Sequence, residues 1–407
     1  MPRPYSTSSG FRGTYNYRPN DRQRYVPRGS PQDPPDNSVF LQGLKATPLE
    51  SVPIPPTVKR VENLNISETK YLGSYDWTTR ATPTILVPGS PAEWLDKKPF
   101  RVPPDTGTNI IDHNSYHLKE MPLLPLFAAV DANEDADTFD WSTVDIVTDR
   151  NGLRRLLRWI SGGEAKPFRI DLQLAGKGTV LMNRWEKEAT SPFLGYAYGT
   201  NYFNAAAKKL HSESTCHHRI IGYQWNGLNM VVRSTVDAFI PVKQNKSDID
   251  DIVSALSSLN VTQSKPEAAT RVKNSSLEVI RLGKEVPQES IVEVATISKA
   301  RESQLDWQEK GPQLYLSQIP HFYVGLHERG NFSEVRKHKF NYTTLPDQVL
   351  EHMKKLRRAL AIIQNVVIKH GKRGRLSLVC IDGTLQVYER EDDKSCLPDE
   401  FMERFGI

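Results

Sequence analysis

Apolar residues that recur every three to four positions predict three helices. They lie at 149–160, 307–317 and 345–370. In the first, Leu153, Leu156 and Ile160 share one face, and Asp149 stands where an acid favours a helix N-terminus. The long helix ends in a basic run, 369–375, which we interpret as a C-terminal cap region, with RNA contact as the alternative.

Short runs of β-branched and aromatic residues, separated by Gly, Pro and Asn, predict strands. They lie at 84–88, 109–112, 168–174, 178–184, 218–225, 228–240, 277–282, 290–297, 321–328, 376–381 and 384–388. Asp382-Gly383 between the last two is a strong signal for a hairpin turn. The polar stretch that follows residue 240, with Asp248, Asp250 and Asp251, predicts a helix and then a loose insertion.

The first sixty residues differ in composition from the rest. Residues 1–38 are rich in Arg, Tyr, Gly, Ser and Pro, with few aliphatic side chains, so they cannot bury enough apolar surface to fold. The proline-rich residues 39–65 predict an extended strap. We therefore predict a disordered tail and strap over 1–60 and one folded domain over 61–407.

The basic tail has two interpretations that the sequence leaves open. Arginine interleaved with tyrosine can neutralise phosphates and stack on unpaired bases, as in tails that bind RNA with little sequence preference. The arginines concerned are Arg12, Arg18, Arg22, Arg24 and Arg28. The alternative is a solubilising or processed leader.

Composition narrows the setting of the protein. No run of about 18 apolar residues could cross a bilayer, so no membrane association is expected. Cys216, Cys380 and Cys396 are far apart and show no C-x-x-C spacing, which indicates neither a disulfide framework nor a zinc ribbon. We expect an intracellular protein, in the nucleus or the cytoplasm, with the arginine-rich tail slightly favouring the nucleus.

The order of elements in the middle of the chain carries the functional information. A helix headed by an arginine is followed by two strands, a strand that ends in an acid, a strand with a second acid and a helix with a glutamine. Metal-dependent nuclease cores place carboxylates from adjacent strands around hard cations that activate water. Asp237 and Glu293 occupy the two strand positions.

Six motifs then resemble those of the DXO-type decapping nuclease and exoribonuclease family. They lie at 146–153 with Arg150, 168–182, 193–199, 232–237 with Asp237, 290–296 with Glu293, and 307–326 with Gln313. The resemblance covers the core, residues 144–330. It implies an α/β fold with a mixed sheet flanked by helices, a restriction-endonuclease-like (PD-(D/E)XK-type) nuclease core behind the disordered basic tail.

Three positions depart from the family pattern. Gly199 stands where the family has a glutamate, Thr235 where it has another, and Ala295 where it has a lysine. Gly199 supplies no metal ligand, Thr235 supplies only a neutral hydroxyl, and Ala295 supplies no cation to orient a water or stabilise charge. Glu186, Glu188 or Lys299 could replace the missing groups if the register is shifted.

Simpler explanations exist for each residue of this constellation. Asp237 and Glu293 could be strand-end carboxylates bound to a backbone amide or an arginine, and Arg150 could be a helix-surface arginine. His217-His218 invites a metal interpretation, but adjacent strand residues point to opposite faces, so a structural role is expected.

Two functions follow from the resemblance. The first is a degenerate nuclease, a pseudoenzyme that binds RNA 5′ ends or a partner and has weak or no hydrolytic activity. The second is an active hydrolase in RNA quality control that removes incomplete or non-standard caps, with Mg²⁺ or Mn²⁺ held by Asp237 and Glu293. In the second, Arg150 binds phosphate and Gln313 positions the substrate. Because some family members bind a 5′-to-3′ exoribonuclease, such a nuclease is the implied partner.

Overall fold

The computed structural model describes residues 37–57, 64–133, 139–162, 166–193, 195–241, 268–371 and 374–406. Residues 38–407 form one compact unit, which therefore includes the predicted strap from Ser38 onward. The arginines of the predicted RNA-binding tail and Asp248, Asp250 and Asp251 lie outside the described residues.

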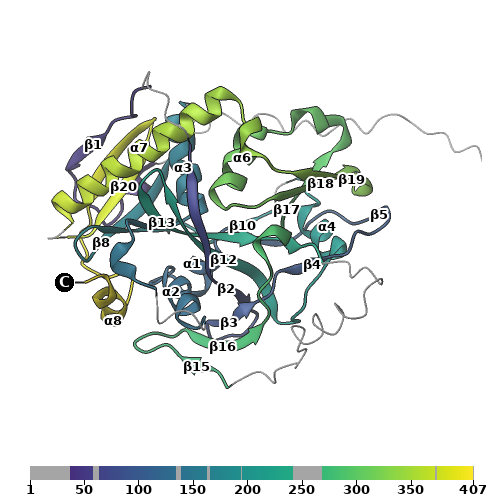
Figure 1. The fold of residues 1–407 in the computed structure, drawn as a ribbon, viewed down its shortest axis with the longest axis horizontal. Coiled ribbons are helices and arrows are strands. Elements are labelled where there is room, and N and C mark those ends of the chain that lie inside the picture. The colour runs from purple at the N-terminus through teal and green to yellow at the C-terminus, as the bar shows by residue number, and fades with distance from the viewer. Residues whose placement is uncertain are drawn as a thin grey trace, which may run out of the picture. The chain divides into compact units, whose positions relative to one another are not determined.

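Two mixed sheets organise the fold (Figure 1). The larger has the strand order β1-β21-β20-β8-β9-β7-β13-β12-β2-β3-β16-β15. Its strands are β1 (Glu50–Val52), β2 (Ile66–Thr78), β3 (Thr84–Gly89), β7 (Ile146–Asp149), β8 (Phe168–Ala175), β9 (Thr179–Trp185), β12 (Ser214–Trp225), β13 (Leu228–Val236), β15 (Thr270–Arg271), β16 (Glu278–Gly283), β20 (Leu376–Ile381) and β21 (Thr384–Glu389). β7 runs parallel to β9 and β13, and β16 runs parallel to β3.

The smaller sheet has the order β11-β4-β14-β17-β18-β19-β5. Its strands are β4 (Ala92–Trp94), β5 (Phe100–Arg101), β11 (Ala207–Lys208), β14 (Ala238–Phe239), β17 (Ile291–Ser298), β18 (His321–Glu328) and β19 (Asn331–Lys339). β10 (Thr190–Pro192) and β6 (Thr108–Ile110) form a separate pair.

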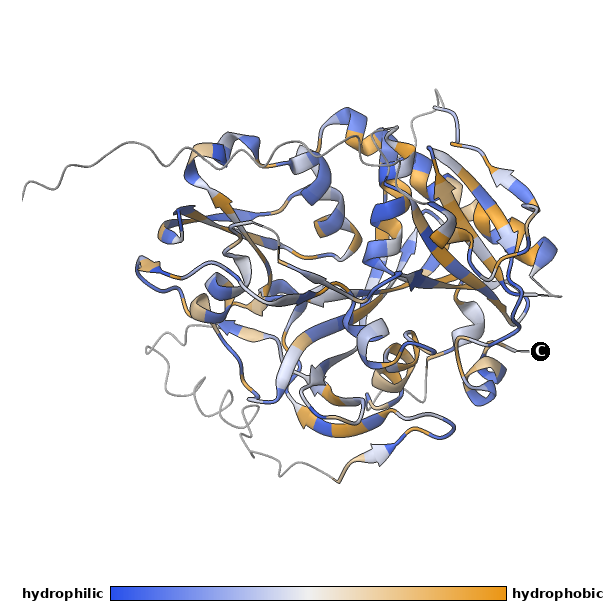
Figure 2. Ribbon diagram, turned by 180° about the vertical axis from the view of Figure 1, so that it is seen from behind, coloured by the Kyte–Doolittle hydropathy of each residue, from blue (hydrophilic) through white to orange (hydrophobic). Residues whose placement is uncertain are grey.

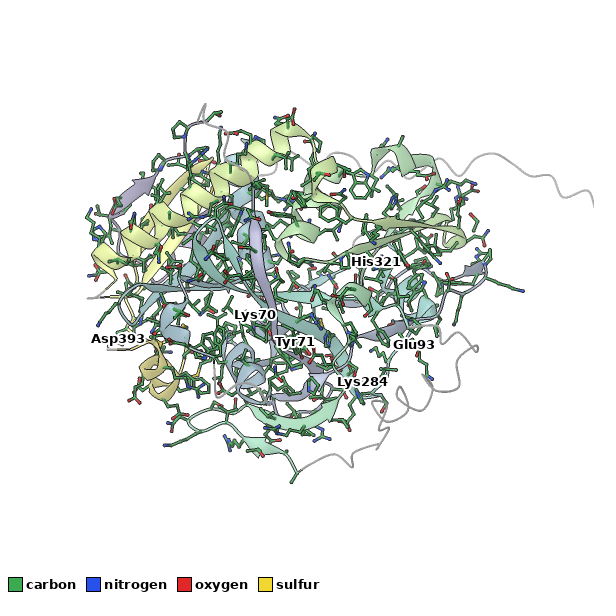
Figure 3. All side chains as sticks on the ribbon, in the orientation of Figure 1. Lys70, Tyr71, Glu93, Lys284, His321 and Asp393 are labelled. Atoms are coloured by element: carbon green, nitrogen blue, oxygen red, sulfur yellow. The ribbon has the colours of Figure 1, made fainter. Side chains whose placement is uncertain are left out.

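Helices cover both faces of the larger sheet. They are α1 (His113–His117), α2 (Leu124–Asp131), α3 (Arg150–Ile160), α4 (Gly199–Ala206), α6 (Trp307–Leu316), α7 (Asp347–His370) and α8 (Asp399–Met402), with 3₁₀ turns at Asn37–Leu41, Trp141–Thr143, Gln288–Ser290, Lys299–Gln304, Tyr342–Thr344 and Glu403–Phe405. α3 and α7 pack together on one face, and side chains fill the space between α7 and the strands (Figure 3). α2 packs against β2 on the other face.

Consecutive apolar residues in the central strands explain why both faces of the larger sheet are covered by helices. Ile146 packs in the core beneath α3 and α7, while its neighbour Val147 packs in the core with α2 and α8. Val231 and Val232 divide in the same way, because successive strand residues point to opposite faces. The central strands therefore carry apolar residues on both of their faces, which Figure 2 shows as orange ribbon inside the molecule.

The periodicity identified α3, α6, α7 and many of the strands correctly, but it missed the shorter helices α1, α2, α4 and α8. α3, α6 and α7 confirm the three predicted helices, and Asp382 and Gly383 both adopt positive φ in the predicted hairpin turn. Asp149 is the N-cap residue of α3, at the helix N-terminus where an acid was expected, although its side chain makes no capping bond. Its carboxylate instead accepts two hydrogen bonds from Arg233.

Gly176 closes the turn between β8 and β9 beneath the C-terminal segment. It has φ +54°, and a Cβ there would overlap the carbonyl oxygen of Phe405, a residue that is 3% exposed. We expect Gly176→Ala to lower the free energy of unfolding by about 3 kcal/mol, measured by urea denaturation. Gly162, with φ +68° and nothing within 4 Å, is the matched control. Gly162→Ala should cost only about 1 kcal/mol, and equal losses would contradict the steric argument.

Candidate functional site

Asp237 lies where the chain passes from one sheet to the other. β13 ends at Val236 in the larger sheet, and β14 begins at Ala238 in the smaller one. Oδ2 of Asp237 accepts a hydrogen bond from the backbone amide of Val294, on β17, at 2.7 Å. This carboxylate therefore ties the end of β13 to β17 at the junction of the two sheets.

Arg150, the first residue of α3, reaches across the same junction. Its Nη1 donates to Oε2 of Glu293 at 2.9 Å and to Oγ of Ser317 at 3.2 Å. Its Nη2 donates to Oγ1 of Thr235 at 3.4 Å. The arginine expected to bind phosphate and one carboxylate expected to bind metal thus form an ion pair with each other.

The two carboxylates of the junction differ in charge because their surroundings differ. Burial, followed by the negative charge of Glu293, raises the pKa of Asp237 to about 7. Burial acts in the same direction on Glu293, but the Arg150 and Lys310 charges outweigh it and lower the pKa of that carboxyl. Near neutral pH Glu293 is ionised, while Asp237 is divided between its charged and neutral forms.

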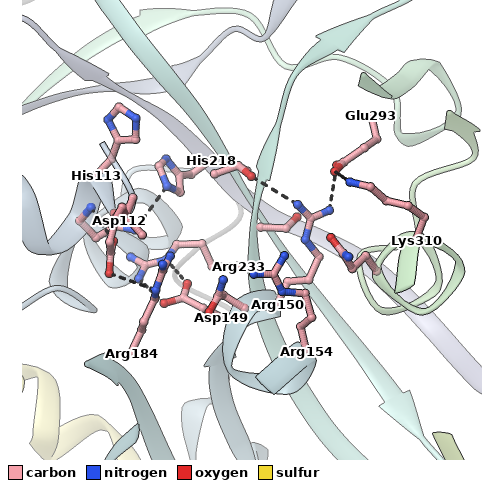
Figure 4. A pocket seen from close by; sticks show the side chains of 16 residues that line it. Asp112, His113, Asp149, Arg150, Arg154, Arg184, His218, Arg233, Glu293 and Lys310 are labelled. Atoms are coloured by element: carbon pink, nitrogen blue, oxygen red, sulfur yellow. Dashed lines mark hydrogen bonds and ion pairs between the residues drawn. The ribbon is translucent and has the colours of Figure 1, made fainter. Parts of the chain in front are cut away.

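A cavity of about 260 Å³ opens beside this pair (Figure 4). It is lined by five cationic side chains: Arg150, Arg154, Arg184, Arg233 and Lys310. Three carboxylates line it as well, those of Asp112, Asp149 and Glu293, so cations exceed carboxylates by two. We call this space the cationic cavity; its charge favours an anion such as a phosphate.

Not all of these cations are equally available to a ligand. Arg233 is 1% exposed and holds Asp149 through two hydrogen bonds of 2.6 and 2.9 Å. Arg154 makes only a long ion pair, 3.7 Å, with Glu309, and its buried Nε has no partner among the described residues. Burial lowers the pKa of Arg154 to about 10, so the guanidinium stays charged near neutral pH. Arg154 is therefore a strong candidate to meet an incoming anion.

The histidines beside the cationic cavity add no charge near neutral pH. Burial lowers the pKa of His113 to about 4 and that of His218 well below its usual range. His218 Nε2 lies 3.3 Å from the amide nitrogen of Asn114, which places the lone pair on that ring nitrogen. His218 stacks on Tyr75 with ring centroids 4.8 Å apart. It serves the packing of this wall, in keeping with the structural role expected for it.

A second cavity, of about 550 Å³, lies on the other side of the junction. It is lined by Asp237 and by all three departures from the family pattern, Gly199, Thr235 and Ala295. Thr235 and His113 line both cavities, so the two spaces adjoin. Hydroxyl, amide and phenyl side chains dominate the wall of the second space, which we call the neutral cavity.

These residues do not fit a divalent cation well. No group of three His, Cys, Asp or Glu side chains in the described part of the chain could hold a metal ion. Magnesium is usually held by one or two carboxylates, with waters completing its shell, so the few carboxylates present would have to be free to bind it. Here the Glu293 carboxylate is paired with Arg150, and that of Asp237 binds the Val294 amide and is partly protonated. A metal would have to displace the Arg150 pair and deprotonate Asp237.

The proposed replacements for the missing groups lie elsewhere. Glu186 forms ion pairs with Arg155 and Arg184, and together with Glu188 it lines a different cavity, bordered by Trp185. Lys299 is exposed and lines neither the cationic nor the neutral cavity. Gln313 does line the cationic cavity, but its amide donates to the backbone and side chain of Glu309, both at 2.9 Å.

The sequence interpretation missed most of the cations that line the cationic cavity. Arg154 stands one helical turn after Arg150 on the same helix face, and that spacing was visible. Arg233 and Arg184 interrupt apolar strands, and a lone charge at a buried strand position marks a buried partner or a cavity. Lys310 reaches the cationic cavity because α6 packs near β17. No local sequence pattern shows that packing.

The pKa of Asp237 predicts a pH effect on stability. The folded state raises this pKa from 3.8 to about 7, so the folded protein favours the protonated carboxyl. The free energy of unfolding should therefore fall as pH rises from about 4 through 7. We expect Asp237→Asn to exceed the wild type in stability at about pH 8 and to match it at about pH 4, by urea denaturation. Asp393→Asn, at an exposed carboxylate (Figure 3), should change neither value; a similar gain there would contradict the assignment.

Comparison with known proteins places the chain in a family. A family model described as a domain of unknown function (DUF8563) matches residues 53–406. The chain belongs to this family. A search of curated proteins finds no match for the DUF8563 chain.

Solved structures share the fold of the DUF8563 chain across most of its length. Candida albicans Rai1 in complex with pU5-Mn²⁺ is 12% identical, with TM-score 0.53, covering 88% of this chain and 99% of that chain. Scheffersomyces stipitis Rai1 in complex with (3′-NADP)⁺ and calcium ion is 10% identical, with TM-score 0.50, covering 86% and 100%. S. stipitis Rai1 is also matched at 12% identity and TM-score 0.50, covering 83% and 97%. The resemblance to decapping nucleases is thereby confirmed at the level of the fold.

Proposed function

We propose that this chain is a decapping-nuclease-like protein that binds RNA 5′ ends and has lost most or all metal-dependent hydrolysis. One observation carries the proposal: five cations line a cavity at the junction of the sheets, and one of them neutralises a carboxylate that would have to bind metal. An RNA 5′ end supplies clustered phosphates, which arginine holds through paired hydrogen bonds.

The substituted positions support the same conclusion. Gly199, Thr235 and Ala295 lie together around Asp237, so the departures from the family pattern fall in one place. A glycine, a threonine and an alanine supply neither a carboxylate ligand nor a cation there. The core is then a nuclease core of the restriction-endonuclease type that retains the architecture and the anion site.

The alternative is an active metal-dependent decapping hydrolase and 5′-to-3′ exoribonuclease. It is favoured by the closeness of the two acids: the negative charge of Glu293 helps to raise the pKa of Asp237, and Glu293 is bound by Arg150. The Rai1 structures named with pU5 and Mn²⁺ or with (3′-NADP)⁺ and calcium show which ligands that fold accepts elsewhere. In this alternative, Mg²⁺ or Mn²⁺ bound by Asp237 and Glu293 would activate water.

Release of cap and nucleotide from 5′-end-labelled RNAs separates the two functions. The RNAs carry triphosphate, unmethylated cap or NAD ends, and Mg²⁺, Mn²⁺ or a chelator is added to the wild type and to the double variant Asp237→Ala plus Glu293→Ala. We expect binding by the wild type and no metal-dependent release. Metal-dependent release that disappears in the double variant would establish the active enzyme instead.

The remaining elements of the proposal concern location and partners. We infer a nuclear or cytoplasmic protein whose arginine-rich tail, with Arg12 to Arg28, adds contacts to RNA, and whose protein partner is a 5′-to-3′ exoribonuclease. No helix in the described ranges is both long and apolar enough to span a bilayer. Removal of residues 1–36 should weaken RNA binding and its salt dependence if the tail contributes.

A further inference from the structure

His217 lines the neutral cavity, away from the Arg150–Glu293 ion pair, and is paired with a buried aspartate behind it. Nδ1 of His217 lies 2.6 Å from Oδ1 of Asp76, its cross-strand partner on β2. The two residues are 5% and 0% exposed. Asp76 is itself held by the amide of Ser90 at 3.2 Å, and a Cβ on Gly89 would come within 2.7 Å of its carboxylate. The pair is therefore firmly positioned.

This arrangement fixes which ring nitrogen of His217 carries the proton and which is left without a partner. A carboxylate oxygen accepts hydrogen bonds, so the tautomer of His217 that satisfies Asp76 has its proton on Nδ1 and its lone pair on Nε2. Nε2 is buried and has no hydrogen-bond partner among the described residues. A buried polar atom without a partner costs about 1–3 kcal/mol, which makes it a candidate for a functional group that a ligand completes.

The wall around His217 suits a nucleoside rather than a metal or a second phosphate. Phe193 and Phe203 offer rings for stacking, and Asn109 and Asn204 offer amides that can bind base edges. The volume of about 550 Å³ lies within the usual range of ligand pockets, about 300–1,000 Å³. Burial raises the pKa of the neighbouring Cys216 thiol, so it stays neutral and offers no thiolate ligand.

The cationic cavity adjoins this space through Thr235 and His113. An RNA whose phosphate lies among Arg150 and Arg154 can therefore place its next nucleoside in the neutral cavity. That nucleoside carries a 2′-hydroxyl, a hydrogen-bond donor that DNA lacks.

We propose that His217, oriented by Asp76, is a general base that acts on the 2′-hydroxyl of RNA bound in the neutral cavity and supports a metal-independent cleavage. This inference rests on the proposed RNA binding. Nε2 takes the 2′-hydroxyl proton, and the 2′-oxygen attacks the adjacent 3′-phosphodiester. The bond from phosphorus to the 5′-oxygen of the next nucleotide breaks, and that oxygen takes a proton from water or from the Lys209 ammonium on the same wall. The products are a 2′,3′-cyclic phosphate and a 5′-hydroxyl.

The test is cleavage of labelled single-stranded RNA by the full chain in excess chelator. We expect fragments that end in 2′,3′-cyclic phosphate, and no cleavage of RNA that is 2′-deoxy or 2′-O-methyl throughout. His217→Gln should lower the rate at saturating RNA at least about 100-fold. Asp76→Asn should also lower it, because an amide that donates to Nδ1 leaves the proton on Nε2. His352→Gln, on α7, is the matched control.

Chemical rescue separates a proton-transfer role from a structural one. Imidazole added to His217→Ala should restore part of the cleavage, which a merely misfolded variant would not show. RNA that is bound but not cleaved by the wild type overturns this proposal and leaves the proposed binding function intact. Equal cleavage by the wild type and His217→Gln also overturns it, whereas a wild type that binds no RNA overturns both.

Discussion

Replacing Arg233 with methionine is expected to lower the free energy of unfolding by about 3–5 kcal/mol, the usual cost of removing one partner of a buried ion pair. Arg233 holds Asp149 through two hydrogen bonds and donates from Nη1 to the hydroxyl of Tyr75 at 3.0 Å and to the carbonyl of Pro122 at 2.8 Å. Methionine keeps the apolar volume but leaves all three acceptors without this donor. Urea denaturation at neutral pH measures the loss.

The double variant Asp149→Asn plus Arg233→Met provides the control. Asparagine carries no charge, so Asp149→Asn removes the carboxylate that Arg233→Met leaves unpaired. The double variant should therefore lose less free energy of unfolding than the two single variants added together. A loss below about 1 kcal/mol in Arg233→Met would show that Asp149 finds solvent or another partner. The pair would then not be needed to hold the start of α3.

Removal of the Arg150 side chain should weaken binding of 5′-phosphorylated RNA about 10- to 100-fold. Hydrogen bonds to charged groups contribute about 1.5–3 kcal/mol, and each 1.4 kcal/mol is a factor of ten in affinity. The Arg150→Ala protein and the wild type are compared by fluorescence anisotropy on RNA with a 5′-phosphate and on the same RNA with a 5′-hydroxyl. The loss should be larger for the phosphorylated RNA.

Arg301→Ala is the matched control for this measurement. Arg301 is an exposed arginine of the 3₁₀ turn Lys299–Gln304 and lines neither the cationic nor the neutral cavity. It should bind both RNAs like the wild type. If Arg150→Ala weakens the binding of both RNAs equally, Arg150 contacts the RNA strand rather than its phosphorylated end. If it weakens neither, the cavity is not the RNA site.

The sequence predicted elements best where their own pattern was strong. α7 and α3 have a clear apolar face, and the turn at Asp382-Gly383 needs residues that tolerate positive φ. β2 and β19 were missed because polar residues occupy most of their exposed halves. Their pairing is set by the strands beside them, which are distant in sequence.

The candidate site was predicted in its order along the chain but not in its chemistry. The motifs pointed to Arg150, Asp237 and Glu293, and the structure brings all three to the sheet junction. That Arg150 would pair with Glu293 depends on how α3 lies against β17, which spacing does not reveal. His217 was expected to be structural, but its pairing with Asp76 across β2 and β12, its unpartnered Nε2 and its place in the cavity wall suggest otherwise.

The chain returns from the smaller sheet to the larger sheet between β14 and β15, and this connection offers a place to divide the protein. β14 ends at Phe239 and β15 begins at Thr270, and each of the two sheets contains strands from before and from after this point. Two polypeptides divided there would each lack partner strands, but co-expressed they should reassemble by fragment complementation. One piece would supply Arg150 and the other Glu293, so recovered RNA binding would report the reunion of the halves.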